Sequence, residues 1–168
     1  MTGLPGVRAV TVRQPWAMLA ADGVAPVLSL PHSTTWRGVL YVHAAANPDT
    51  AALNLPHVIE ALNACDNLTR TDTEHLDWLT YGAVVAVGRL IDVHDPVAQP
   101  ALFGEPGVCC EPWGAVRAPG GRRARHWVLA DVFRLGYPVT AVGRPSLWTP
   151  DARLIRHVTE VLPTEVPA

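Results

Sequence analysis

An arginine, a glutamine and a tryptophan lie close together around Pro15, in the segment TVRQPWAMLAADG. A guanidinium group can pair with phosphate, a glutamine amide can read a base edge, and an indole ring can stack on a base. Arg13, Gln14 and Trp16 therefore predict contact with a nucleotide or a nucleic acid. The opposing interpretation is that Trp16 packs in the core while Arg13 pairs with an acid, and the sequence leaves both open.

Two further basic elements fit the same chemistry. Trp36 and Arg37 precede an apolar run, and the segment GGRRARHW places three arginines after two glycines. Such an arm is expected to clamp phosphates with an affinity that falls as salt rises, and a solvated loop is the alternative. The predicted nucleic-acid-binding set is Arg13, Gln14, Trp16, Trp36, Arg37, Arg122, Arg123 and Arg125.

Four other polar residues are candidates for acid–base chemistry. Asp92, His94 and Asp95 follow a strongly apolar run, where such a cluster more commonly ends a strand and starts a turn. His43 lies within another apolar run, so we expect a hydrogen-bonded core histidine there. The sequence predicts no catalytic residue.

The cysteines and the basic residues restrict the possible chemistry further. The chain has three cysteines, two of them adjacent, which is a poor disulfide framework. Cys109 and Cys110 lack the C-x-x-C spacing of a paired zinc motif, so neither they nor His94 or His126 predict a metal site. No cofactor is predicted. The chain also contains no lysine, which excludes a lysine base or Schiff base.

The composition is that of a globular domain. In 168 residues, 49% are hydrophobic and 17% are charged, so the chain can bury a core and is not disordered. No segment has the roughly 18 apolar residues of a membrane span, and the first residues lack a secretory pattern, so we expect a cytoplasmic protein without membrane contact. The net charge of −2 conceals an asymmetry. Range 47–111 holds ten acids and two arginines (−8), whereas 113–156 holds eight arginines and two acids (+6), which is typical of an anion-binding face or of ordinary mixed surfaces.

Hydrophobic periodicity predicts strands that alternate with helices. Strands are expected over 8–13, 38–45, 82–95, 126–135 and 137–143, and helices over 15–23, 47–67 (in two pieces divided at Pro56), 72–80 and 149–162, the last with Thr149 as its cap. Range 96–125 is expected to be a long loop, well beyond the usual ~4–6 residues, and so functional or mobile. The pattern favours a single small α+β domain with a barrel-like sheet.

Several motifs together resemble the ASCH domain of the PUA-like superfamily. TVRQPWAMLAADG, WRGVLYVHAA, YGAVVAVGRLIDVHD, HWVLAD and GRPSLWTPD occur in the order and approximate spacing of that domain, over residues 8 to about 152. The resemblance implies an α+β fold: a PUA-like β-barrel, mixed and mainly antiparallel, flanked by helices. It also implies a cleft that handles RNA, DNA or a nucleoside. Some members bind nucleic acid, others resemble amidohydrolases acting on acylated cytidines, and ribonuclease activity is also proposed.

This sequence departs from the family pattern directly after the first helix. Typical members continue with a polar strand that supplies a lysine, a threonine and an arginine, but here the segment is GVAPVLSL, with Ala25, Pro26 and Leu30 near those positions. Alanine and proline cannot activate a nucleophile or stabilise charge. The resemblance thus implies that the acylcytidine chemistry is lost while the cleft persists.

The leading prediction is a binding module for RNA, single-stranded DNA or a nucleotide. A hydrolase using Asp92, His94 or His43 is the first alternative. The second is a protein-interaction module whose apolar segment GVAPVLSLP forms an exposed patch. The burial of Leu28 and Leu30 would weaken this second alternative.

Overall fold

The computed structural model describes residues 6–66, 78–101 and 103–163. Its main sheet has six strands in the order β2-β7-β4-β3-β1-β8. Their bounds are β1 Arg8–Val12, β2 Val27–Leu30, β3 Gly38–Ala44, β4 Ala83–His94, β7 Arg125–Thr140 and β8 Leu147–Trp148. β1 runs parallel to β3 and the other neighbours are antiparallel, so the sheet is mixed.

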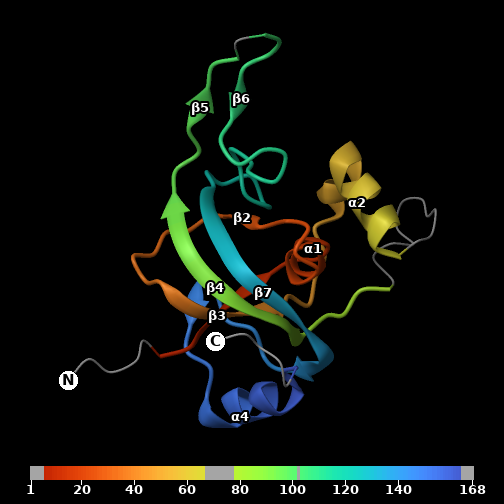
Figure 1. The fold of residues 1–168 in the computed structure, drawn as a ribbon, viewed down its shortest axis with the longest axis vertical. Coiled ribbons are helices and arrows are strands. Elements are labelled where there is room, and N and C mark those ends of the chain that lie inside the picture. The colour runs from red at the N-terminus through yellow and green to blue at the C-terminus, as the bar shows by residue number, and fades with distance from the viewer. Residues whose placement is uncertain (1–5, 67–77, 102, 164–168) are drawn as a thin grey trace.

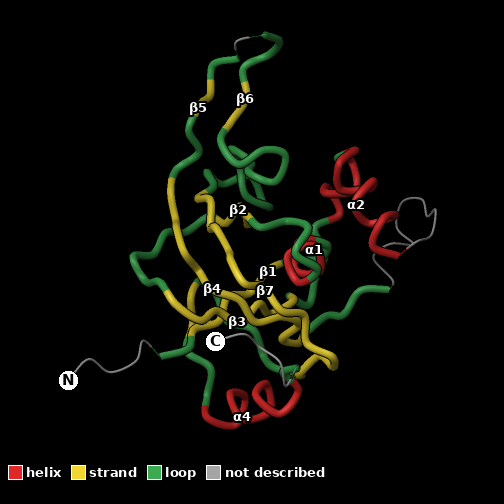
Figure 2. The backbone as a smooth tube through the Cα atoms, viewed as in Figure 1, coloured by secondary structure: helices red, strands yellow, loops and turns green. Residues whose placement is uncertain are grey.

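The sheet curls into a half-barrel, and β4 and β7 form its long central pair (Figure 1). The register between them shifts at three places, between Val84 and Ala86, Val87 and Arg89, and Leu90 and Asp92. Each irregularity bends the strands and increases their twist, which curls the sheet. Beyond one end of this pair, β5 (Ala98–Gln99) and β6 (Gly107–Val108) form a short projecting hairpin, visible at the top of Figure 2.

Helices cover both faces of the curled sheet. The described helices are α1 Trp16–Ala21, the 3-10 helix η1 Thr50–Asn54, α2 Pro56–Asp66 and α4 Ala152–Val161. Alternate residues of β1 point to opposite faces, so that Val10 packs in the cluster that contains α1, and Ala9 packs in the cluster that contains α4. α2 and η1 pack on the outer side of α1 through a third buried cluster.

The α+β class and its main elements are confirmed. The expected strands 38–45, 82–95 and 126–135 and the expected helices near 15–22, 56–65 and 150–160 all occur close to their predicted bounds. None of the helices in the described parts of the chain is long and apolar enough to cross a membrane.

Four details differ from expectation or lie beyond what is described. Ranges 126–135 and 137–143 form one strand, because β7 continues pairing with β4 as far as Thr140. The cap of α4 is Asp151 rather than Thr149, since the Asp151 carboxylate accepts a hydrogen bond from the Leu154 N–H at 2.8 Å. The expected loop 96–125 contains the β5–β6 hairpin. Most of the expected helix 72–80 lies outside the described residues.

The apolar segment after α1 is a buried strand. Leu28 and Leu30 in β2 are 2% and 7% exposed, and β2 pairs along its whole length with the start of β7. This burial weakens the prediction of an interaction module with an exposed GVAPVLSLP patch. Burial by the sheet also gives a structural reason why a polar segment is followed directly by an apolar one.

His43 in β3 is a buried, hydrogen-bonded histidine. It is 2% exposed, and its Nε2 lies 2.9 Å from the carbonyl oxygen of Ala141, so Nε2 carries the proton and donates. Its ring also meets the edge of Trp148, with 6.0 Å between ring centroids. Burial lowers the pKa of His43, and the hydrogen bond to Ala141 opposes this shift only in part. The imidazole is therefore neutral at pH 7, in agreement with the expected core role.

We predict that His43 makes the stability of the fold sensitive to acid. Its pKa in the folded protein lies below the usual 6.5, so the unfolded chain binds more protons in acid. The stabilisation is present above about pH 6.5 and is lost as the pH falls toward the lower folded pKa. His43→Gln, which keeps a donor for Ala141, should flatten the pH dependence of the unfolding free energy by up to about 1.4 kcal/mol per pH unit.

Urea unfolding at a series of pH values measures this effect. Above pH 7 the difference in unfolding free energy between the wild-type protein and His43→Gln should stay constant as the pH changes. This pH range provides the internal control. An equally steep acid dependence in His43→Gln would contradict the prediction.

Candidate nucleic-acid interface

A cleft of about 830 Å³ opens between the start of α1, β2, η1 and the segment 112–122. We call the segment 112–122 the cleft wall. This volume lies in the range that accommodates a nucleotide-sized ligand. Much of the lining is apolar, including Leu28, Leu30 and Ala52. The charged, aromatic and imidazole side chains that line it are Arg13, Arg117, Arg122, Trp16, Trp113, His32, His57 and Asp49.

The cleft has an excess of positive charge. Arg13, Arg117 and Arg122 are exposed, and within the described ranges none of the three forms an ion pair. The Arg117 side chain donates a hydrogen bond to the carbonyl oxygen of Gly121 at 2.8 Å, which holds it over the turn of the cleft wall. Three guanidinium groups therefore face the single carboxylate of Asp49, an arrangement that attracts anions.

Trp16 both packs in the core and lines the cleft. It is partly buried against two of the apolar clusters, and its Nε1 donates a hydrogen bond to Asp49 Oδ2 at 2.8 Å. This bond fixes the orientation of the indole and occupies the one carboxylate that the described residues contribute to the cleft lining. Trp113 approaches from the cleft wall, where the His57 ring meets its ring at a steep angle with 5.3 Å between centroids. The cleft is thus lined by two indoles from segments that are far apart in the sequence.

Two imidazoles of the cleft have polar atoms without partners. Nε2 of His32 and Nε2 of His57 are both buried and have no hydrogen-bond partner among the described residues. Burial, followed by the nearby Arg122 charge, lowers the pKa of His32, so its ring is neutral at pH 7. Buried polar atoms of this kind are rare in folded proteins unless something satisfies them. Both atoms are closed off from solvent, so they do not by themselves indicate a ligand in the cleft.

Of the predicted binding residues, Arg13, Trp16 and Arg122 line the cleft and Gln14 does not. Gln14 is 1% exposed, its amide donates to the carbonyl oxygen of Thr80 at 2.8 Å, and its oxygen accepts from the Met18 N–H at 2.9 Å. The side chain of Gln14 is therefore committed to holding the start of α1.

The other four predicted binding residues lie outside the cleft lining. Trp36 packs against the core cluster around α1, and Arg37 lies 3.5 Å from the carboxylate of Asp92. Arg123 and Arg125 both pair with Asp95, at 3.8 Å and 2.5 Å. The arginine-rich arm is thus divided, with Arg122 in the cleft while Arg123 and Arg125 share the carboxylate of Asp95.

Five of the charged, aromatic and imidazole side chains that line the cleft are absent from the predicted set: Arg117, Trp113, His32, His57 and Asp49. Arg117 and Trp113 belong to the long segment recognised as unusual, so proximity to Arg122 could have indicated them. His32, His57 and Asp49 carry no signal in the sequence, because only the folding of β2, η1 and α2 against the cleft wall brings them together.

The acid–base candidates lie elsewhere. Nδ1 of His94 donates a hydrogen bond to Oδ2 of Asp92 at 2.7 Å, and this bond is the main reason that the pKa of Asp92 is lowered. Asp95 pairs with arginines, as described above. Neither these three residues nor His43 is among the described residues that line the cleft.

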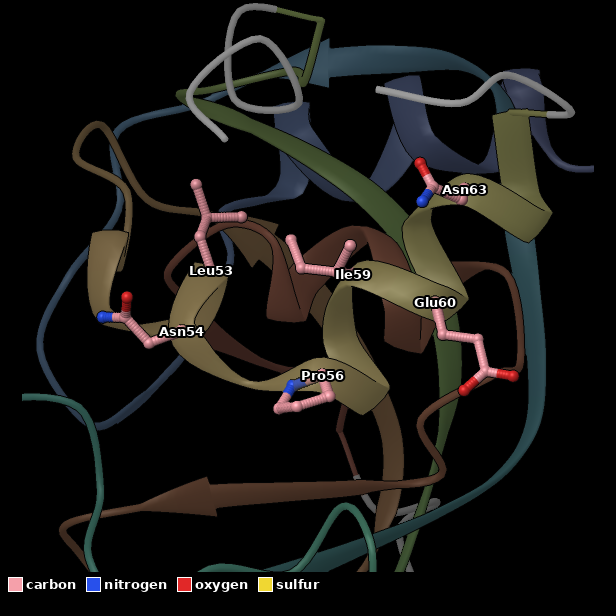
Figure 3. Close-up of a pocket in the computed structure, with 6 residues that line it drawn as sticks. All are labelled: Leu53, Asn54, Pro56, Ile59, Glu60 and Asn63. Atoms are coloured by element: carbon pink, nitrogen blue, oxygen red, sulfur yellow. The ribbon is translucent and has the colours of Figure 1, made fainter. Parts of the chain in front are cut away.

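A second, open depression of about 550 Å³ lies beside η1 and α2 (Figure 3). Its apolar part comes from Leu53, Pro56 and Ile59, and its polar part comes from Asn54, Glu60 and Asn63. The only charged side chain in this lining is a carboxylate, so the depression is poorly suited to an anion. The larger cleft is the better candidate for a ligand site.

Comparison of the sequence with protein-family models and with curated proteins found no match in either set. A functional assignment therefore depends on the geometry of the cleft.

The cleft wall is anchored to the sheet at Gly114 and Ala115. The Ala115 N–H donates to Ser29 Oγ at 2.9 Å, and Nε2 of His126 donates to the carbonyl oxygen of Ala115 at 3.0 Å. Gly114 is packed so tightly that a Cβ atom would lie 2.6 Å from the carbonyl oxygen of Cys109 and 2.7 Å from Cε1 of His126. The wall can reach this position only because residue 114 has no side chain.

We predict that Gly114→Ala lowers the unfolding free energy by about 1–3 kcal/mol, the usual cost of overpacking. Gly136→Ala is the matched control, because no atom lies within 4 Å of a Cβ atom built at Gly136 in β7. Urea unfolding of both variants measures the difference. Equal stability of the two variants would show that the wall shifts without cost.

Proposed function

We propose that this protein binds single-stranded nucleic acid, one nucleotide of which enters the cleft, and that its fold is a PUA-like domain of the ASCH type. The observation that carries the proposal is the convergence on one cleft of two tryptophans and three arginines that form no ion pair with the described residues. The resemblance of the RQPWA and WRGVLYVHAA motifs to the ASCH domain supports it independently, as does the curled mixed sheet.

Each group in the cleft matches one part of a nucleotide. The guanidinium groups of Arg13, Arg117 and Arg122 suit phosphate oxygens. The Trp16 and Trp113 indoles suit the face of a base, a contact worth roughly 1–3 kcal/mol per base. An acidic ligand without rings would use only the first of these groups.

The cleft supports binding better than hydrolysis. Ala25, at the position of the family lysine, is fully buried, and neither it nor Pro26 is among the residues that line the cleft. Asp92, His94 and His43, the other catalytic candidates, also lie outside that lining. A bound nucleotide would therefore meet cations and aromatic rings, but not a positioned nucleophile from these residues.

We predict that phosphate contacts dominate the salt dependence of binding. Each contact with single-stranded nucleic acid contributes about 0.7 to the slope of log affinity against log salt concentration. The triple variant Arg13→Ala, Arg117→Ala, Arg122→Ala should therefore reduce that slope by up to about 2 units. Fluorescence titration of labelled single-stranded RNA and DNA at several salt concentrations measures the slope.

The matched control is the triple variant Arg89→Ala, Arg123→Ala, Arg134→Ala. It removes the same number of charges, but each of these arginines is paired with a carboxylate: Asp131, Asp95 and Asp22 respectively. The control should keep nearly the full slope. Failure of the wild-type protein to bind at low salt, or equal losses in the two variants, would reject the proposal.

We also predict that bases contribute through stacking. An oligonucleotide with abasic sites should bind the wild-type protein more weakly than the same backbone with bases, by roughly 1–3 kcal/mol for each base that stacks. Its salt slope should be unchanged, because stacking releases few ions. This comparison leaves the protein unmodified, which avoids disrupting the core packing of Trp16. Equal affinities would restrict recognition to the phosphate backbone.

A further inference from the structure

Four side chains that can bind a metal ion converge at the base of the β5–β6 hairpin, outside the cleft lining. They are His94, Cys109, Cys110 and His126, and one ligand atom of each lies within 4.8 Å of the others. His126 is fully buried, and both cysteines are partly buried. We call these residues the Cys–His cluster.

The fold brings the two histidines together through strand pairing. His94 ends β4 and stands opposite His126 near the start of β7 in the antiparallel register. Residues that face each other across such a pair project from the same side of the sheet. Their rings lie 5.3 Å apart between centroids and are steeply inclined, so neither ring blocks the nitrogen of the other.

The two cysteines come from the turn that follows β6. The Cys109 N–H bonds to the carbonyl oxygen of Val97 at 2.9 Å, which fixes the turn to the start of the hairpin. Cys110 adopts φ +68°, a left-handed conformation that is unfavourable for a residue with a side chain. Adjacent residues in extended chain point in opposite directions, and this turn instead aims both thiols at the histidines. Such a strained residue commonly marks a functional site.

Three of the six ligand–ligand distances match a tetrahedral zinc site, and all six lie within 4.8 Å. Nε2 of His94 lies 3.6 Å from Cys109 Sγ and 3.5 Å from Cys110 Sγ, and Nδ1 of His126 lies 3.4 Å from Cys109 Sγ. Bonds of about 2.3 Å from zinc to sulfur and 2.0–2.1 Å to nitrogen, at a tetrahedral angle, separate sulfur from nitrogen by about 3.5–3.6 Å. One ion at the centre would reach all four ligands with little movement.

The outer hydrogen bonds leave the correct ring nitrogen available on each histidine. Nδ1 of His94 donates to Asp92, and Nε2 of His126 donates to the carbonyl oxygen of Ala115. The lone pairs of the opposite nitrogens therefore face the thiols. The Val97 N–H also donates to Cys109 Sγ at 3.2 Å, a bond that stabilises a thiolate. Metal-binding histidines typically have such carboxylate or carbonyl partners.

We infer that His94, Cys109, Cys110 and His126 bind one structural Zn²⁺ ion in tetrahedral geometry. Two sulfur and two nitrogen ligands suit zinc, and four protein ligands leave no open position for a substrate. On binding, both thiols lose their protons to solvent, and the two thiolates balance the charge of the ion. This inference does not rest on the proposed nucleic-acid function.

The same atoms contain a shorter chain, from a thiol through His94 to Asp92, that resembles the nucleophile and base of a thiol hydrolase. That chemistry needs one cysteine, one histidine and access for a substrate. It leaves the second cysteine and the position of His126 Nδ1 beside Cys109 Sγ without a role, and the cluster lies outside the cleft lining. Zinc uses all four ligands.

The ion would fasten the long segment between β4 and β7 to the sheet. The turn at Cys109 and Cys110 leads directly into the cleft wall, and the N–H groups of Trp113 and Gly114 bond to the carbonyl oxygen of Cys110 at 3.1 Å and 2.7 Å. Removing the ion should loosen the wall, which carries tryptic sites at Arg117 and Arg122.

Elemental analysis and cobalt substitution test the inference on the full chain. The purified wild-type protein should bind one Zn²⁺ per chain, and Co²⁺ in its place should give the intense visible bands of a tetrahedral ion with a thiolate charge-transfer band. Cys109→Ser and Cys110→Ser should each lose the bound ion. Cys65→Ser, which removes the third cysteine, should keep one ion per chain.

A second measurement covers the case in which the cysteine variants fail to fold. In wild-type protein loaded with Zn²⁺, a thiol reagent should leave two of the three cysteines unmodified until a chelator is added, and the chelator should also accelerate tryptic cleavage of the cleft wall. No uptake of Zn²⁺ or Co²⁺, an octahedral Co²⁺ spectrum, or loss of the ion in Cys65→Ser would overturn the inference. Rapid alkylation of one cysteine, unaffected by excess Zn²⁺, would instead favour the thiol nucleophile.

Discussion

The pairing of β4 with β7 is the interaction on which the rest of the structure depends. These two strands occupy the centre of the sheet, and their three register shifts produce the curl that encloses α1. At one end, the same register sets His94 opposite His126. At that end the chain must leave β4, travel through residues 95–125 and return to begin β7. Both the Cys–His cluster and the cleft wall depend on this one long connection between β4 and β7.

A connection of that length must be held in place at several points, because ordering each of its residues costs conformational entropy. The hairpin of β5 and β6, the Gly114 contact and the Ala115 hydrogen bonds supply three of them. A zinc ion in the Cys–His cluster would add a fourth near the middle. β2 completes the arrangement: it pairs with β7 and contributes Ser29, which accepts the Ala115 N–H. The apolar strand after the RQPWA motif is therefore the support against which the cleft wall rests.

Local patterns were sufficient to predict the class and most elements of the fold, because β4, β7 and α4 each carry strong periodicity in a continuous segment. They also indicated Arg13, Trp16 and Arg122. The Cys–His cluster could not be predicted, since adjacent cysteines match no zinc spacing and their histidines are distant along the chain. Pairing across strands, together with a left-handed Cys110, brings the ligands together. Counting charges along the sequence likewise failed to separate Arg122 from Arg123 and Arg125, because only the fold shows that the latter two pair with Asp95.

The pairing of several arginines with carboxylates also limits how strongly the cleft could attract nucleic acid. Range 113–156 has a formal charge of +6, from eight arginines and two acids, but only Arg117 and Arg122 of these eight line the cleft. Arg123, Arg125 and Arg134 are paired with carboxylates, so moving them onto phosphate would expose those acids to the ligand. With Arg13, three phosphate contacts at most come from the lining. Under the proposed function, three contacts would give a shallow salt dependence, so selectivity for an unpaired base would have to come from the indoles rather than from charge.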